Sequence, residues 1–197
     1  MKQTREKTRK RFLDTLQEIG EQVLKNKSNI DTENILDVID IVLEIHKEGN
    51  RIFVYGAGRS GFIGSCFAQR LMHLGIKSCF VSDAVTYQYN ESDLVIIISG
   101  SGETTSPMAI AQKARKIGGK IVLITGNPDS TIGKLADYII KVKGKSKDAA
   151  TTKDTLAPYT SLFDVSTLSV LDSIGGTLME ILGVTETDID KRHATIE

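Results

Sequence analysis

The chain has 197 residues, 40% of them hydrophobic, which predicts one well-buried core and excludes two full-sized domains. Its 25 basic and 25 acidic side chains cancel, so no global charge favours nucleic acid or an anionic membrane. No continuous apolar run reaches the roughly 20 residues of a membrane span, and no signal-type segment opens the chain, so we expect a cytoplasmic protein.

The first 50 residues predict two amphipathic helices. Their apolar residues recur at helical spacing: Phe12, Leu13, Leu16, Ile19, Val23 and Leu24 in the first, and Ile35, Leu36, Ile39, Val42 and Leu43 in the second. The opening "MKQTREKTRKR" is basic and predicts a solvated helix end rather than a nucleic-acid arm. We therefore expect a basic helical segment over residues 1–30 and a single domain with a C-terminal tail over 31–197.

Five short apolar stretches predict strands: "RIFVY", "KSCFV", "LVIIIS", "KIVLIT" and "YIIKV". Strands without polar alternation, most of them separated by helix-length segments, are typical of a parallel sheet covered on both faces. The sequence predicts a doubly wound α/β sandwich of the flavodoxin type with five parallel strands. A polar loop over 143–160 precedes a long apolar helix that ends near Gly183.

The two cysteines, Cys66 and Cys79, lie within apolar patterns, and no histidine stands at ligand spacing from them. We expect buried thiols rather than a disulfide or a metal site.

The first strand runs into a glycine turn, "GAGRSG". Gly56, Gly58 and Gly61 match the G-x-G-x-x-G spacing of dinucleotide-binding turns, and Asp83 stands about where a ribose-binding acid belongs. The motif is weak, because any phosphate-binding α/β turn gains from glycines that let a phosphate approach the positive end of a helix.

A second loop, "SGSGET", leaves the third strand in the same structural position. Ser99, Ser101 and Thr104 place three hydroxyls around two glycines at a helix start, whereas capping explains only one. Loops that follow parallel strands meet at one edge of the sheet, so the two loops are expected to share a phosphorylated ligand. A dinucleotide enzyme would need one such loop and a further substrate domain.

The stretches "GAGRSGFIG", "FAQRLMHLG", "SGSGET" and "KRHATIE" together resemble the sugar isomerase (SIS) domain family, and within it the 6-phospho-3-hexuloisomerases. The resemblance covers the chain from about residue 35. It implies isomerisation of D-arabino-hex-3-ulose 6-phosphate to D-fructose 6-phosphate without metal or cofactor, in the ribulose monophosphate route of formaldehyde fixation. It also implies a homotetramer with active sites between subunits.

The resemblance assigns substrate binding to six residues: Gly58, Arg59, Ser60, Ser99, Ser101 and Thr104. For Ser60, a helix cap is an equal alternative. Relatives carry a glutamate after a phenylalanine at the start of the last long helix, whereas "SLFDV" places Asp164 there. Asp164 is then a working base, a weakened one, or only a first-turn acid that suits the helix dipole.

His193 lies in a polar tail with no apolar face to explain it. The resemblance makes it a proton donor that reaches into its own or a neighbouring subunit; the alternative is a solvated tail. For His73, near a helix end, packing or capping is expected.

Other interpretations stay open. One is an isomerase of another phosphosugar, such as arabinose 5-phosphate, because "DAVTYQYNESD" departs from the hexuloisomerase pattern. Another is a non-catalytic phosphosugar-binding regulator, since this fold serves both roles. A dehydrogenase is the weakest, because it leaves the hydroxyls of the second loop unexplained.

Overall fold

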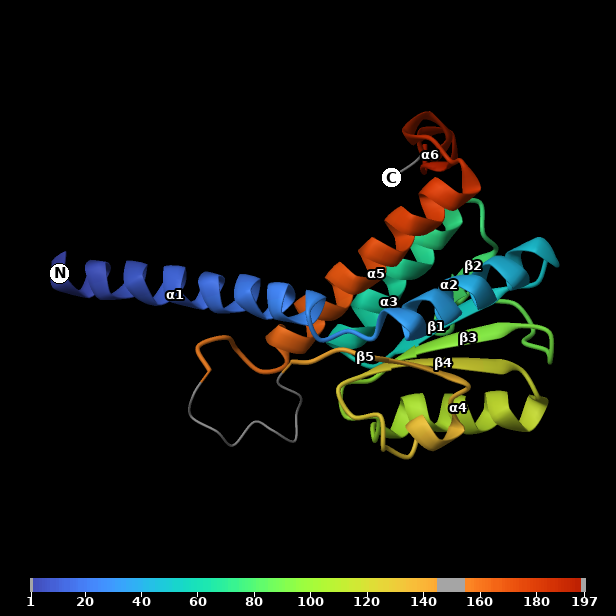
Figure 1. Cartoon of the computed structure of the whole chain (residues 1–197), viewed down its shortest axis with the longest axis horizontal. Helices are drawn as coiled ribbons and strands as arrows, with labels where there is room; N and C mark the ends of the chain where they lie inside the picture. Colours follow the sequence, from blue (N-terminus) through green and yellow to red (C-terminus); the bar gives the residue numbers. More distant parts are fainter. Residues whose placement is uncertain (1, 145–154, 196–197) are drawn as a thin grey trace.

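The computed structural model describes residues 2–144 and 155–195 (Figure 1). Most of the predicted polar loop, residues 145–154, lies outside the described residues. Two helices, α1 (Lys2–Lys27) and α2 (Thr32–Lys47), precede the sheet, as predicted. The later elements are β1 (Ile52–Gly56), α3 (Arg59–His73), β2 (Ser78–Phe80), β3 (Leu94–Ile98), α4 (Thr105–Ile117), β4 (Lys120–Thr125), the short 3-10 helix η1 (Gly133–Leu135), β5 (Tyr138–Lys141), α5 (Ser161–Leu182) and α6 (Glu186–Arg192).

In the described residues the strands form one parallel sheet in the order β2-β1-β3-β4-β5, which confirms the predicted architecture. The chain winds from β1 outward to β2 and then returns to β3, on the other side of β1. Gly56 and Ile98, the last residues of β1 and β3, are register partners. The direction of winding therefore reverses between β1 and β3, and the loops after these two strands begin side by side.

The helices form a layer on each side of the sheet (Figure 1). On one side α2, α3 and α5 pack on alternate strand residues such as Ile52 and Val54, and on the other α4 and η1 pack on residues such as Phe53. Both faces of each central strand are thus buried, which explains why the strand sequences are continuously apolar.

Helix α5 is, within the described residues, the one helix long and apolar enough to cross a membrane by length and composition. The sequence expectation missed it because serines, threonines and aspartates interrupt its apolar residues. This length and composition are weak evidence for a membrane span, because the core helix of a soluble protein can have both. Helix α5 buries Leu171, Ile174 and Leu178 in the core.

The prediction of buried thiols is wrong for Cys66, which is exposed, and Cys79 is half-buried. Helix α3 turns Ile63, Phe67 and Leu71 toward the sheet. Cys66 stands one residue before Phe67, about 100° around the helix, and so faces outward.

Candidate active site

The turn between β1 and α3 brings the start of the helix against the end of the strand. A side chain at Gly56 would place its Cβ 2.6 Å from the carbonyl oxygen of Ser60, so only glycine fits there. Gly58 is the N-cap of α3, with a φ of 57°, and it offers no side-chain cap. The cap position is thus taken by glycine, and the Ser60 hydroxyl instead lies 3.5 Å from a carboxylate oxygen of Asp164.

Asp164 is almost completely buried, with 3% of its surface exposed, in the first turns of α5. Its Oδ2 accepts hydrogen bonds from Arg59 Nε at 2.8 Å and from Thr160 Oγ1 at 2.7 Å. The Arg59 side chain is 61% exposed, so it covers the carboxylate from the solvent side. A first-turn acid that served only the helix dipole would not need these side-chain partners.

A hollow of about 180 Å³ adjoins this ion pair. Arg59 and Asp164 form its polar part, and its apolar lining comes from α3 and α5: Phe62, Ile63, Val165 and Leu168. The carboxylate therefore borders a small space that is largely apolar, which favours contact with carbon-bound hydrogens of a ligand.

The hydroxyls of the serine-rich loop, Ser99–Thr104, shape its backbone. Ser99 is buried, and its Oγ accepts from the amide of Gly102 at 3.2 Å. The Oγ of Ser101 accepts from the amide of Glu103, also at 3.2 Å. Thr104 is the N-cap of α4 but makes no capping hydrogen bond. Capping thus does not account for Thr104, whose Oγ1 accepts from the Ser99 hydroxyl at 3.5 Å. The Ser101 hydroxyl accepts from an amide and has a proton of its own to donate.

Two further contacts hold this loop in place. Gly102 has a φ of 68°, and a Cβ there would collide with Ser130. Glu103 Oε1 accepts from the amide of Thr131 at 2.7 Å, and this hydrogen bond lowers the pKa of the exposed Glu103 carboxyl. Glu103 therefore orients backbone and stays ionised.

The start of helix α5 contacts both loops. A Cβ on Gly100 would lie 3.3 Å from the ring of Phe163, so this ring packs on the serine-rich loop, while the next residue, Asp164, holds Arg59 of the glycine turn. The six predicted binding residues and Asp164 therefore share one edge of the sheet. Of these, Arg59, Ser60 and Asp164 are in direct contact.

His193 does not join this group within one chain. It is exposed, it follows α6, and its ring stacks on that of His73 with the centroids 5.1 Å apart. Arg192 Nη1 donates to the carbonyl of His73 at 2.8 Å. His73 ends α3 and Arg59 begins it, so the 15-residue helix separates the two positions by roughly 20 Å.

His73 is packed, as predicted, with 7% of its surface exposed. Burial lowers its pKa below the ordinary value, and the neighbouring His193 and Arg70 lower it further. The neutral imidazole is thus the favoured form at this end of α3.

Thr160 was missed by reasoning from the sequence. It is the N-cap of α5, and among the described residues it is the one non-glycine with a positive φ, 59°. Its position before a helix indicates an ordinary cap, so no local pattern predicts that its hydroxyl bonds Asp164.

A doubly wound sheet with two glycine-rich loops at its switch point defines a class of α/β proteins that bind phosphorylated ligands. Within this class the chain belongs to the SIS domain family, whose model matches residues 44–167. The matched region includes both loops and Asp164 but neither α1 nor His193.

Relatives narrow the class further. The 3-hexulose-6-phosphate isomerase of Bacillus subtilis (strain 168) is 38% identical over 181 residues, which cover 91% of this chain and 96% of the relative. A solved structure from Methanococcus jannaschii, described as inferring a function of 3-hexulose-6-phosphate isomerase, has a TM-score of 0.78 and 34% identity, over 94% of this chain and 98% of that one.

These relatives confirm the resemblance to 6-phospho-3-hexuloisomerases and support the phosphosugar isomerase class. The structure of the Vibrio vulnificus NanR protein, complexed with ManNAc-6P, is 19% identical with a TM-score of 0.73, over 90% of this chain and 65% of that one. At this identity the likeness shows the fold alone.

Proposed function

We propose that the protein interconverts D-arabino-hex-3-ulose 6-phosphate and D-fructose 6-phosphate, as a cytoplasmic enzyme of the ribulose monophosphate pathway that needs no cofactor. The relatives support the coarser class, a phosphosugar isomerase. The observation that carries the proposal is a buried carboxylate, Asp164, held at the edge where two phosphate-type loops meet.

The two loops supply the binding energy for a phosphorylated sugar. Helices α3 and α4 both begin at this edge, and their first amides, with the positive ends of their dipoles, suit a phosphate dianion. Ser101 and Thr104 add hydroxyl donors beside α4. Binding the remote phosphate in this way holds the reacting carbons against the base.

The reaction moves the carbonyl between carbons 2 and 3 of the sugar. Asp164 takes the proton from the carbinol carbon; the C–H electron pair becomes the new C=C bond, and the carbonyl oxygen gains the charge of an enediolate. The hydroxyl proton of the neighbouring carbon then passes to the former carbonyl oxygen and neutralises its charge. As that neighbouring oxygen becomes the new carbonyl, the C=C electron pair takes the proton back from the same carboxyl at the former carbonyl carbon. Arg59 lies 2.8 Å from Asp164, close enough to stabilise the enediolate oxygen.

The two carboxylate oxygens of Asp164 differ in how free they are to take a proton from the substrate. Oδ2 accepts two short hydrogen bonds, from Arg59 and Thr160, whereas within the described residues Oδ1 has only the 3.5 Å contact with Ser60. We therefore assign the proton transfer to Oδ1.

His193 would serve as the proton donor for ring opening in a neighbouring subunit, because α3 separates it from Asp164 of its own chain. This role requires a homo-oligomer, which the family resemblance makes a tetramer. In this proposal residues 1–30 form an assembly helix and residues 31–197 the isomerase domain.

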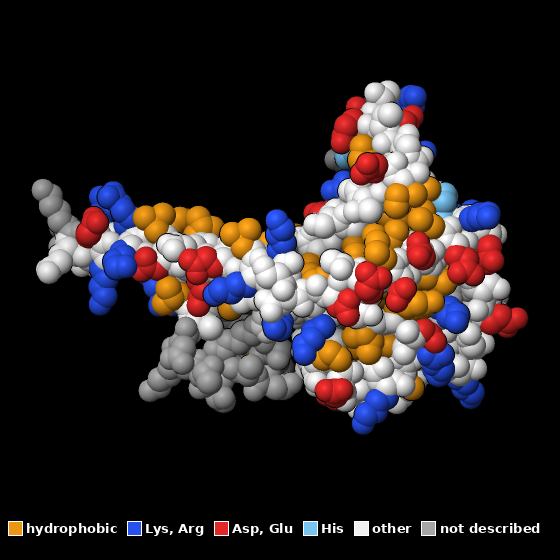
Figure 2. All heavy atoms as spheres, in the orientation of Figure 1, with side chains coloured by type: hydrophobic (Ala, Val, Ile, Leu, Met, Phe, Trp, Pro, Cys, Tyr) orange, Lys and Arg blue, Asp and Glu red, His pale blue; other side chains and the backbone are white. Residues whose placement is uncertain are grey.

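Helix α1 has the surface that such an assembly needs. It extends away from the sheet, and hydrophobic side chains line its upper side (Figures 1 and 2). Phe12, Leu13, Leu16 and Leu24 are 65%, 53%, 57% and 69% exposed. An apolar stripe on a projecting helix is unfavourable in water, because most helical stability comes from packing such a face.

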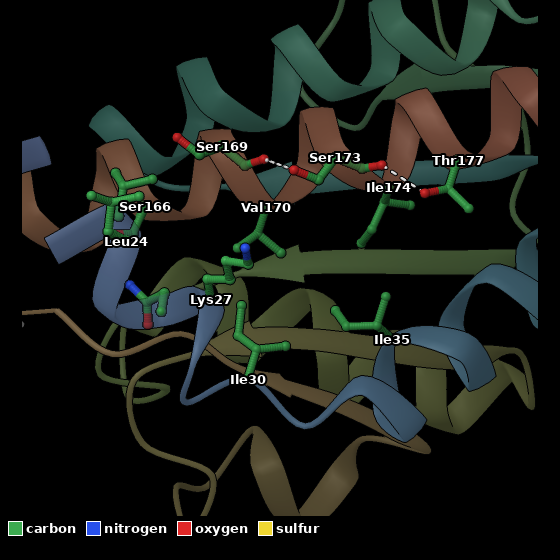
Figure 3. Close-up of a pocket in the computed structure, with 12 residues that line it drawn as sticks. Leu24, Lys27, Ile30, Ile35, Ser166, Ser169, Val170, Ser173, Ile174 and Thr177 are labelled. Carbon is green, nitrogen blue, oxygen red and sulfur yellow. Dashed lines mark hydrogen bonds between the residues drawn. The ribbon is translucent and has the colours of Figure 1, made fainter. Parts of the chain in front are cut away.

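A groove at the base of α1 continues this stripe. It measures about 370 Å³; Val23 and Leu24 of α1 line it together with Ile35 of α2 and Ile174 of α5. Figure 3 shows Ile30 and Ile35 on one side of it, opposite Val170 and Ile174 of α5. The hydroxyl of Ser166, which also lines it, is buried without a hydrogen-bond partner in the described residues.

Charge favours a second copy of this chain as the occupant. The exposed face of α2 carries Glu33, Asp37, Asp40 and Glu44 at helical spacing, beside the groove. The first half of α1 carries the basic residues Arg5, Lys7, Arg9, Lys10 and Arg11. An α1 from a second copy would bring its basic end to the acidic α2 while its apolar stripe covers the groove.

Light scattering on the purified protein tests the assembly. Leu16→Glu places a charge in the stripe and is expected to shift the protein to smaller species. Val85→Glu is the matched control, because Val85 is 85% exposed and far from α1 in sequence. An oligomer that persists unchanged in Leu16→Glu would contradict the role of α1.

A coupled assay tests the reaction itself. The purified protein is supplied with 3-hexulose-6-phosphate synthase, formaldehyde and ribulose 5-phosphate, and fructose 6-phosphate is followed through phosphoglucose isomerase and glucose-6-phosphate dehydrogenase. Turnover is the expected result. Binding of fructose 6-phosphate without turnover would instead favour a non-catalytic phosphosugar-binding protein, or another substrate.

A further inference from the structure

Thr160 has a backbone conformation that threonine rarely adopts. Its φ of 59° and ψ of −11° lie in the left-handed region, where a β-branched residue is a genuine outlier. Such strain persists only where the surrounding structure demands it, and it gathers at functional sites.

Helix capping does not explain this conformation. An ordinary N-cap has an extended backbone and a side chain that bonds a helix amide. Thr185, the N-cap of α6, has both features: its φ is −99°, and its hydroxyl accepts from the amide of Asp188 in a full capping box. Thr160 has neither feature: its backbone is left-handed, and its hydroxyl makes no capping hydrogen bond to an amide of α5.

The contacts of Thr160 converge on the proposed base instead. Its Oγ1 donates to Asp164 Oδ2 at 2.7 Å, and its carbonyl accepts from the Asp164 amide at 2.9 Å. The second partner of Oδ2, Arg59, has a side chain that is 61% exposed, so a bound phosphosugar can draw it away. Thr160 is half-buried in the segment that leads into α5, so its side chain is less free to move than that of Arg59.

We propose that Thr160 is a positioning residue, which fixes the carboxylate plane of Asp164 so that Oδ1 faces the substrate. This inference rests on the proposed function, in which Asp164 is the base. The last torsion of an aspartate side chain is broad and roughly two-fold, so an unanchored carboxylate presents either oxygen over a wide range of angles. The left-handed backbone brings the hydroxyl to Oδ2 and accounts for the strain.

Three substitutions separate the hydroxyl from the backbone. Thr160→Val keeps the shape and removes the hydroxyl, and Thr160→Ser keeps the hydroxyl. Thr160→Gly removes the hydroxyl and suits the left-handed backbone. Steady-state kinetics and thermal unfolding are measured on each full-length variant and on the matched control, Thr185→Val, which loses a hydroxyl that also bonds an aspartate, at 2.6 Å.

We expect kcat to fall about 10- to 100-fold in both Thr160→Val and Thr160→Gly, because small misplacements of a catalytic group have effects of this order. KM should stay within about twofold, since binding contacts are untouched, and Thr160→Ser should recover most of kcat. Thr160→Gly should unfold no earlier than the wild type, because it relieves strain. Thr185→Val should unfold at lower temperature with kcat unchanged.

Wild-type kcat in Thr160→Val, or activities that follow thermal stability across the series, would overturn the positioning role. Absence of turnover in the wild-type protein would count against the proposed function and remove the basis of this inference with it. Turnover in the wild type with an unimpaired Thr160→Val would refute only the role of Thr160.

Discussion

The two ends of helix α3 hold opposite kinds of chemistry. At its first turn, Arg59 and Ser60 surround the buried carboxylate of Asp164. At its last turn, the buried imidazole of His73 stacks on His193, and Arg192 binds its carbonyl. The positive end of a helix favours an anion and its negative end a cation. The dipole of α3 therefore favours the Asp164 carboxylate at the first turn and the Arg192 guanidinium at the last, while burial keeps His73 neutral.

The two ends of α3 carry different functional groups. Among the described residues, the first end has a carboxylate, amide donors and hydroxyls, which suit proton transfer and phosphate binding, but no histidine. The other end has histidines and, within the described residues, no phosphate-type loop. The proposed donation of a proton by His193 to a neighbouring subunit would bring these two ends together in one site.

The largest expected effect is at the carboxylate end. Asp164→Asn should lower kcat about 10²- to 10⁴-fold, the usual contribution of a general base. The matched control is Asp172→Asn, on the same helix, where Asp172 is about half exposed and pairs with Arg70 at 3.2 Å. Near wild-type kcat in Asp164→Asn, measured in the coupled assay, would remove Asp164 from the mechanism.

A mixing experiment compares the two ends directly. His193→Gln should lower kcat at least about tenfold, as loss of a proton donor does. If the ends belong to different subunits, hybrids of Asp164→Asn and His193→Gln contain sites with both groups intact. Activity should then rise after the two proteins are unfolded together and refolded. Mixtures no more active than their components would contradict a shared site.

A smaller effect is expected in the serine-rich loop. Ser101→Ala removes a hydroxyl proposed to donate to the phosphate, and a hydrogen bond to a charged group contributes about 1.5–3 kcal/mol. The dissociation constant for fructose 6-phosphate should therefore rise about 10- to 100-fold in a calorimetric titration. Ser92→Ala, in the exposed loop before β3, is the control. Unchanged affinity in Ser101→Ala would overturn the assignment of this loop.

The smallest expected effect concerns pH and the histidine end. The pKa of His73 lies below its ordinary value of 6.5, so the unfolded chain takes up a proton that the folded chain resists. His73 therefore contributes its full stability above pH 6.5, and that contribution declines as the pH falls below this value. Urea unfolding at about pH 7.5 and about pH 5.5 should show a larger loss of unfolding free energy in the wild type than in His73→Gln. Equal losses would contradict this account.

The elements of the fold could be predicted because their causes are local. Continuous apolar strands, helix-period stripes and glycines at helix ends are readable in short windows, and they located both loops at the switch point. The pairing of Gly56 with Ile98 follows from that topology.

What escaped prediction depends on long-range packing. Arg59 and Asp164 are 105 residues apart, and only the docking of α5 beside α3 brings them together. Thr160 has a left-handed backbone, whereas its position before a helix predicts an extended cap, so no local pattern predicts its conformation. The family resemblance leaves open whether His193 reaches into its own or a neighbouring subunit, and within one chain its ring stacks on His73 at the far end of α3.

The central claim is proton transfer by Asp164 at carbons 2 and 3 of a phosphosugar. Proton NMR of fructose 6-phosphate incubated with the protein in heavy water tests it most directly. We predict deuterium at carbon 3, together with formation of the 3-hexulose, and neither in Asp164→Asn. Deuterium at carbon 1 instead, or 3-hexulose formation that persists undiminished in Asp164→Asn, would contradict the account.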